Sequence, residues 1–150
     1  MNQRPVAKKR IDQINADHLA EPPLSGAQQE AFRRGIDLFN ARKFWEAHEV
    51  WEEIWKDRPE DSRIFFQGII QAAAGWHLIV TVPRQRGALG NIRKALTILE
   101  VFPQMYLGID VGRLRQDLLE ARKVVLGLGT ERLKEFPGER ISPIRFTTPY

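Results

Sequence analysis

Cysteine is absent from this chain of 150 residues, which excludes disulfide bonds and metal sites built on thiolates. The absence also suits a reducing compartment. No apolar run approaches the roughly 20 residues that a membrane-spanning helix needs. The first residues are polar and basic, so they do not resemble the apolar core of a secretion signal. These absences lead us to expect a soluble, cytoplasmic protein with no membrane partner.

A strong excess of one charge is lacking as well. The formal net charge is +4 and the sequence pI is near 9.7, an excess that permits weak contact with anionic partners. Lysine and arginine are scattered without a recognition motif, so no specific nucleic-acid signature is present. Hydrophobic residues make up 43% and charged residues 28% of the chain, which is the composition of a globular protein. A chain of this length is expected to form one domain.

Apolar residues at helical spacing dominate the middle of the chain, so we expect an all-α fold, a single helical bundle over residues 26–136. Caps and helix breakers predict five main helices, over about 26–40, 44–57, 63–80, 84–102 and 111–126. Ser25 and Asp110 are placed to cap the first and the fifth of these helices, and Asp61-Ser62 to cap the third. Thr130 is expected to cap one more short turn, and no strand pair or hairpin is predicted.

Two flanking segments fall outside the predicted bundle. Residues 1–25 form an N-terminal arm with few apolar residues, and the pair Pro22-Pro23 interrupts any helix there. We expect this arm to be extended or weakly ordered, and dispensable for folding. Residues 137–150 hold several prolines and are expected to form an extended C-terminal tail.

The third predicted helix, over residues 64–80, is apolar on every side, as expected of a helix buried at the centre of the bundle. One stripe of small residues favours close packing of another helix: Gly68, Ala72 and Gly75. The polar residues within the run are Gln67, Gln71 and His77. A buried polar group without a partner costs about 1–3 kcal/mol, so these side chains are expected to find hydrogen bonds, in a core network or a binding site.

The second predicted helix holds the densest concentration of reactive side chains. Three of the chain's four tryptophans lie in this segment, together with four glutamates and His48. On a helical wheel one face is apolar: Phe44, Ala47, Trp51, Ile54 and Trp55. A second stripe is acidic and consists of Glu46, Glu49 and Glu53. Glu52 lies beside this stripe. Like charges one turn apart repel, so a bound proton, cation or partner would reduce the repulsion between these carboxylates.

Carboxylates beside an imidazole are suitable ligands for a divalent metal. The candidate metal ligands are His48, Glu49, Glu52 and Glu53. The pattern is incomplete, because Glu52 stands where a zinc protease helix has its second histidine. The Glu-x-x-His motif of di-iron bundles also requires copies on other helices. If the chain is an enzyme, Glu46, Glu49 or Glu53 would be the general base and His48 an acid/base group or metal ligand.

A short pattern matches the spacing of one tetratricopeptide unit: Gly35, Ala47, Trp51 and Pro59. One repeat period later the pattern is missing, and stacking requires at least about three repeats. The match therefore indicates two closely packed antiparallel helices, and it keeps a protein-interaction role open.

A longer pattern runs from about Glu30 to Leu99. Its parts are Phe39-Asn40, Phe44-Trp45-Glu46-Ala47-His48-Glu49, Glu52-Glu53, Trp55, Gln67-Gly68-Ile69-Ile70-Gln71, His77 and Gly87-Ala88. This pattern resembles an uncharacterised bacterial and archaeal family, domain of unknown function 309. The resemblance implies a small helical bundle without an established activity. The polar positions that it emphasises are Asn40, Glu46, His48, Glu49, Glu53, Gln71 and His77.

Two functional hypotheses follow from these patterns. In the first, a polar pocket between the second and third helices binds a small ligand or a divalent metal. Carboxylates and His48 would face Gln71 or His77 there, and the candidate ligand-binding residues are Asn40, Trp45, Gln67, Gln71 and His77. In the second, the same residues form a structural network, and the chain is a non-catalytic module that binds a protein partner or a second copy of itself. An open cavity lined by the carboxylates would favour the first hypothesis.

Overall fold

Five helices make up most of the protein in a computed structural model that describes residues 19–56 and 63–148. They are α1 (Gly26–Asn40), α2 (Phe44–Trp55), α3 (Ile64–Val80), α4 (Gln85–Leu99) and α5 (Val111–Leu128). Two short 3₁₀ helices follow, η4 (Leu133–Glu135) and η5 (Gly138–Arg140). The all-α fold class is therefore confirmed. Within the described residues, no helix has both the length and the apolar character needed to cross a membrane.

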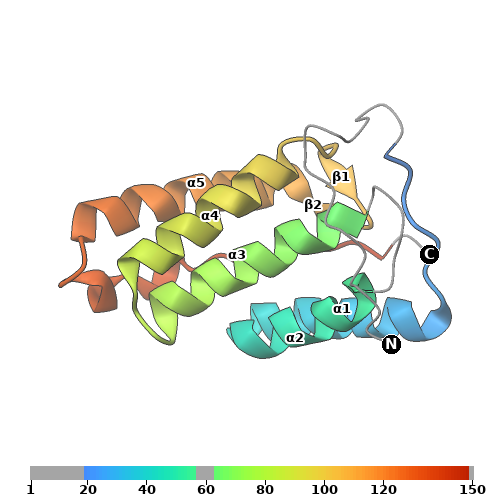
Figure 1. Ribbon diagram of the computed structural model, residues 1–150, viewed down its shortest axis with the longest axis horizontal. Helices are drawn as coiled ribbons and strands as arrows, with labels where there is room; N and C mark the ends of the chain where they lie inside the picture. The colour runs from blue at the N-terminus through green and yellow to red at the C-terminus, as the bar shows by residue number, and fades with distance from the viewer. Residues whose placement is uncertain (1–18, 57–62, 149–150) are drawn as a thin grey trace, which may run out of the picture.

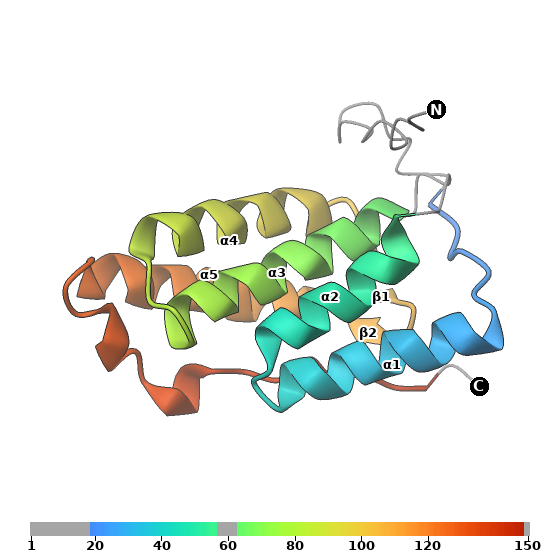
Figure 2. The ribbon, with the colours of Figure 1, turned by 60° about the horizontal axis from the view of Figure 1, so that its bottom comes forward.

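The helices lie roughly parallel or antiparallel along the long axis of the molecule, and each packs against the next in the chain (Figure 1). The helix α3 lies between α2 and α4 in both views, with α1 outside α2 (Figure 2). The prediction that the third helix is central is confirmed, because 11 of its 17 residues are buried and none of the others is fully exposed.

Two of the predicted helix starts are confirmed in atomic detail. The Ser25 hydroxyl accepts a hydrogen bond from the Gln28 backbone N–H at 3.1 Å, and the Gln28 side chain accepts one from the Ser25 N–H at 2.9 Å. This reciprocal pair is a capping box, which satisfies two amide groups at the exposed start of α1. The Asp110 carboxylate caps α5 in a similar way, by accepting from the Arg113 N–H at 2.9 Å.

The stripe of small residues on α3 packs against α4. A Cβ atom added at Gly68 would lie 2.9 Å from Ile98 Cγ2, and one added at Gly75 would lie 3.1 Å from Ile92 Cγ1. Side chains at these two positions would force the helices apart, since interiors are close-packed. The stripe therefore serves helix packing.

A two-stranded hairpin, which the sequence pattern did not predict, joins α4 to α5. Strands β1 (Met105–Tyr106) and β2 (Ile109–Asp110) pair antiparallel. The turn between them places Leu107 at φ 50° and Gly108 at φ 81°. Strands of two residues are too short to show the alternating pattern that reveals longer strands, and Leu-Gly is not the Asn-Gly or Asp-Gly signal of such turns.

The short turn expected after α5 is confirmed as η4. It begins after Arg132, however, so Thr130 does not cap it.

The described end of the N-terminal arm, residues 19–25, contacts this hairpin. The Tyr106 hydroxyl donates to the Ala20 carbonyl at 3.0 Å, and the Leu107 N–H donates to Glu21 Oε1 at 2.7 Å. Pro22 is buried. The segment has no regular secondary structure but is held by these contacts. The remainder of the predicted arm, residues 1–18, lies outside the described residues, as do Asp61 and Ser62, which were expected to cap the third helix.

The C-terminal tail returns along the bundle to the junction of α1 and α2. Beyond η5 it is extended, and it forms a bridge between Ile109 and Phe146. Ile144 is buried in the core, and its backbone is held from both sides by Asn40. Tail and bundle are thereby joined over much of the tail's length.

Candidate functional site

Three aromatic side chains from α2 and α3 form a cluster at the surface between these helices. The Trp45 ring stacks on His48, with centroids 4.6 Å apart and planes 10° apart. The same ring lies 5.2 Å from His77 of α3, tilted by 40°. Trp45 is 45% exposed, whereas both histidines are half-buried beside it. We refer to Trp45, His48 and His77 as the Trp45 cluster.

The antiparallel packing of α2 against α3 creates this cluster. At the start of α2 and the end of α3, Phe44 stacks on Trp76 with centroids 6.1 Å apart and planes 19° apart. At their other ends, the Arg63 guanidinium lies 5.3 Å from the centroid of Trp55. Successive helical residues lie about 100° apart, so the residues next to the buried Phe44–Trp76 pair emerge at the surface. Those residues are Trp45 and His77.

The two imidazoles are held by packing rather than by hydrogen bonds through Nδ1. His48 Nδ1 lies 3.6 Å from Glu52 Oε2, slightly beyond hydrogen-bonding range. The Nδ1 atoms of His48 and His77 are both buried, and neither forms a hydrogen bond with a described residue. A ligand could reach these atoms only if a ring moved. The most exposed part of the cluster is therefore the indole of Trp45.

The acidic stripe lies on the solvent side of α2. Glu46, Glu49 and Glu53 are exposed, opposite the buried face of the helix. Glu53 forms an ion pair with Lys56 at 2.9 Å, while Glu46 and Glu49 form no ion pair with any described residue. None of these carboxylates forms a hydrogen bond or ion pair with Gln71 or His77 among the described residues, so the structure shows no such contact. Water screens the repulsion between them, which removes the need for a buried counter-ion.

The glutamines of α3 also differ from the expected core network. Gln67 and Gln71 are half-buried and lie one turn apart on the least buried stripe of the helix. Neither side chain forms a hydrogen bond with another described residue, and neither amide is enclosed. Water can therefore satisfy both amides. Among the polar residues of α3, only His77 joins the Trp45 cluster.

Asn40 has a structural use. Its side-chain Oδ1 accepts from the Ile144 N–H at 2.7 Å, and its Nδ2 donates to the Ile144 carbonyl at 3.1 Å. Both ends of the amide are thus engaged with the tail. This candidate ligand-binding residue is not available at the Trp45 cluster.

A metal site of the predicted composition is not assembled. Across residues 19–56 and 63–148, no group of three or more histidine and carboxylate side chains is placed to hold a metal ion. His48 and Glu52 approach each other to 3.6 Å, whereas Glu49 and Glu53 lie on the exposed stripe. Two groups from a single helix make an incomplete site, because structural and catalytic metals take three or four protein ligands.

One buried carboxylate was not anticipated from the sequence. Asp117 of α5 is buried and forms an ion pair with Arg113 at 3.1 Å. Burial raises the pKa of Asp117, although the nearby Arg113, Arg145 and Ser142 each act to lower that pKa. Two of these partners lie in the tail, so the group joins α5 to the tail. No local signal could reveal a contact of such long range.

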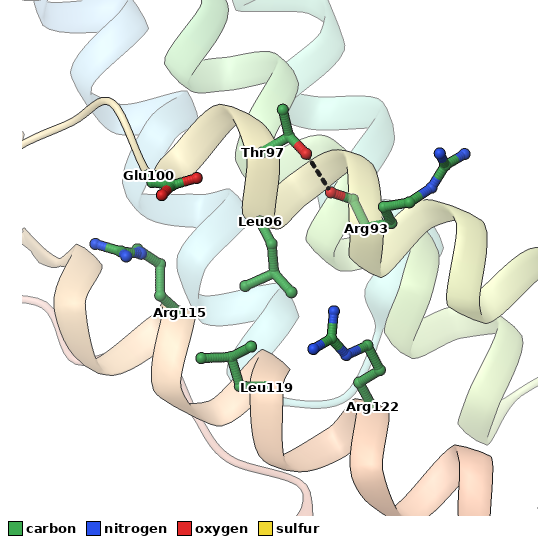
Figure 3. Close-up of a pocket in the computed structure, with 7 residues that line it drawn as sticks. All are labelled: Arg93, Leu96, Thr97, Glu100, Arg115, Leu119 and Arg122. Carbon is green, nitrogen blue, oxygen red and sulfur yellow. Dashed lines mark hydrogen bonds between the residues drawn. The ribbon is translucent and has the colours of Figure 1, made fainter.

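Sequence reasoning also missed the arginines that line a groove between α4 and α5, namely Arg93, Arg115 and Arg122 (Figure 3). Arg115 and Arg122 are seven residues apart with Leu119 between them, a spacing that puts all three on one face of a helix. This spacing could have indicated a basic face on α5. It does not indicate that α4 lies opposite that face.

Residues 32–90 match the model of the family described as Domain of unknown function (DUF309). The resemblance inferred from the sequence is thereby confirmed over those residues, which include the whole Trp45 cluster. The chain is also similar to an uncharacterized protein of Aquifex aeolicus (strain VF5), with 26% identity over 127 residues. This alignment covers 84% of the chain but only 36% of the relative, so the chain spans about a third of that protein's length.

Proposed function

We propose that the chain is a non-catalytic binding module whose contact surface is the Trp45 cluster together with the exposed carboxylates of α2. The partner is a basic segment of another protein. The observation that carries this proposal is the position of Trp45, which is 45% exposed although stacked on His48 and packed beside His77.

The packing of Trp45 favours binding for an entropic reason. Ordering a mobile side chain at an interface costs about 0.5–1.5 kcal/mol, and a ring already held by its neighbours avoids much of this cost. Tryptophan is also among the residues enriched at energetically dominant interface positions. Val82, which is 40% exposed, follows α3 at the same end of the bundle and adds apolar surface near the cluster.

The charge of α2 favours a cationic partner. Four exposed glutamates border the cluster: Glu46, Glu49, Glu52 and Glu53. A basic segment would place cations beside these carboxylates while an apolar side chain contacts Trp45. Such complementarity increases the association rate and selects against acidic partners.

The size of the Aquifex aeolicus relative is consistent with a module. The similar segment makes up 36% of that protein, so it occurs there beside a larger stretch of other sequence. A helical unit that matches only part of a longer protein is consistent with a binding role. A cytoplasmic location, expected from the absence of cysteine, belongs to the same proposal.

Fluorescence anisotropy with two labelled peptides tests this proposal. The first peptide has about 15 residues, enough for about four helical turns, with leucine and lysine at helical spacing. The second has glutamate in place of lysine. We expect the lysine peptide to bind and the glutamate peptide not to bind. Trp45→Ala should weaken binding about tenfold or more, as at interface hot spots, whereas Leu126→Ala, which removes another exposed apolar side chain, should not.

Equal losses in Trp45→Ala and Leu126→Ala would contradict the proposal, because they would indicate non-specific adhesion. So would failure of the lysine peptide to bind. A rise in melting temperature with Zn²⁺ or Mn²⁺ that is lost in Glu52→Gln would instead favour the metal-site hypothesis, since a metal that binds the folded state stabilises it.

A further inference from the structure

The groove between α4 and α5 has the size and lining of a small-ligand site. Its volume is about 360 Å³, within the range of about 300–1,000 Å³ typical of ligand pockets. Three arginines, two leucines and a glutamate contribute to its lining: Arg93, Arg115, Arg122, Leu96, Leu119 and Glu100. None of the lining residues belongs to the Trp45 cluster, so the groove is a different site.

The antiparallel packing of the two helices sorts these side chains along the groove (Figure 3). Glu100 of α4 lies opposite Arg115 of α5 at one end. Leu96 and Leu119 face each other in the middle. Arg93 and Arg122 lie at the other end, which has no carboxylate in its lining; the Arg122 guanidinium points toward the leucines, whereas that of Arg93 extends away from them. The groove is therefore cationic at one end, apolar in the middle and mixed in charge at the far end.

The side chains of the two arginines at the cationic end have no partner within residues 19–56 and 63–148. Neither Arg93 nor Arg122 forms an ion pair or a side-chain hydrogen bond with any described residue. Both side chains are exposed and unpaired among the described residues, so the Arg93 guanidinium can turn toward Arg122, and an anion between the two would attract both charges. A phosphate group suits the position, because the planar guanidinium donates two parallel hydrogen bonds to its oxygens.

The rest of the lining limits what the phosphate can be attached to. Leu96 and Leu119 are half-buried and present apolar surface beside the cationic end. An organic group bonded to the phosphate would rest on these leucines and exclude water from them. A nucleic-acid strand fits less well, because it requires a continuous basic track for successive phosphates. Here the track is interrupted by the leucines and then by Glu100.

We propose that the groove binds a small organic monophosphate, with the phosphate held between Arg93 and Arg122 and the organic group on Leu96 and Leu119. This site is independent of the surface proposed for protein binding. The helices that line it, α4 and α5, lie on the opposite side of the bundle from α1, with α2 and α3 between them (Figure 1).

Calorimetric titration with phenyl phosphate tests the site, with inorganic phosphate and phenol as companion probes. Phenyl phosphate should bind more tightly than either companion, because it alone supplies both the dianion and the apolar group. Arg93→Gln and Arg122→Gln should each weaken its binding about tenfold, the effect of losing one charge-assisted hydrogen bond. Both residues are exposed, so the variants should keep the wild-type urea midpoint.

Arg33→Gln is the matched control. It removes the same charge from an exposed position on α1, on the far side of the molecule. Binding should remain unchanged in this variant. An equal loss in Arg33→Gln would show general attraction by net charge and would overturn the proposal. The proposal would also be overturned if phenyl phosphate failed to bind, or if an oligothymidylate bound more tightly and lost affinity in Arg122→Gln.

Discussion

Gly35 allows α1 and α2 to approach so closely that Trp51 lies directly over its Cα atom. A Cβ atom at this position would lie 2.6 Å from both Cδ1 and Cε2 of Trp51, and closer still to the indole nitrogen. Trp51 is fully buried, and its indole N–H donates to the Phe32 carbonyl at 3.1 Å. We therefore expect Gly35→Ala to displace Trp51 and to destabilise the protein.

The expected magnitude combines opposing effects. Overpacking in a close-packed core costs about 1–3 kcal/mol. Displacement of the indole would also weaken its hydrogen bond to Phe32, and a buried group left without a partner costs about 1–3 kcal/mol. Alanine in place of glycine within a helix stabilises the folded state by about 0.5–1 kcal/mol, which offsets part of these costs. The net loss in the free energy of unfolding should be about 2–4 kcal/mol.

Urea denaturation followed by circular dichroism measures this loss, and Gly90→Ala provides the matched control. Gly90 lies within α4, and a Cβ added there would meet no other atom within 4 Å. The control should be more stable than the wild type by about 0.5–1 kcal/mol, since only the helix preference changes. If Gly35→Ala were as stable as Gly90→Ala, the close contact between Gly35 and Trp51 would not exist in solution.

Three further predictions concern Asp117, Tyr106 and Glu49. Because burial raises the pKa of Asp117, the folded state binds its proton more tightly than the unfolded state does. The group therefore favours folding most below its unfolded pKa of about 3.9, and this contribution is lost as the pH rises through the raised folded value. Urea midpoints should accordingly show the wild type gaining stability relative to Asp117→Asn between neutral pH and about pH 4; a constant difference would contradict this linkage. Tyr106→Phe removes the hydrogen bond to Ala20 and should cost about 0.5–1.5 kcal/mol in urea denaturation; no loss would mean that the arm end does not dock. Glu49→Gln should change stability by less than about 0.5 kcal/mol, because Glu49 is exposed and has no ion-pair partner among the described residues. Thermal scans should show no rise with Mn²⁺ or Zn²⁺ in either protein, and a rise that disappears in Glu49→Gln would restore the metal hypothesis.

Much of the helical architecture could be predicted from local patterns. The first helix spans 26–40 as expected, because Ser25 and Gln28 form a cap within one turn of sequence. The buried position of α3 followed from its apolar residues alone, since such a helix has no side that favours water. These features depend on residues close together in the chain, so they can be inferred without knowledge of the neighbouring helices.

The candidate site was only partly predictable for a related reason. The sequence drew attention to Trp45 and His48, which are three residues apart on one helix and do stack. It also suggested that the acidic stripe faced the third helix, and the structure places Glu46 and Glu49 on the solvent side. Periodicity separates an apolar face from a polar one. It does not reveal which flank of the polar face lies beside a second helix.

The sequence by itself determined where helices begin, which faces are apolar and which helix is central, because caps and periodicity act over a few residues. Only the tertiary structure decided that His77 meets Trp45, that Asn40 binds the tail and that arginines of α4 and α5 share a groove. Each of these contacts joins residues far apart in the chain. Their geometry depends on how side chains of two helices interlock, which fixes the relative rotation and offset of the helices.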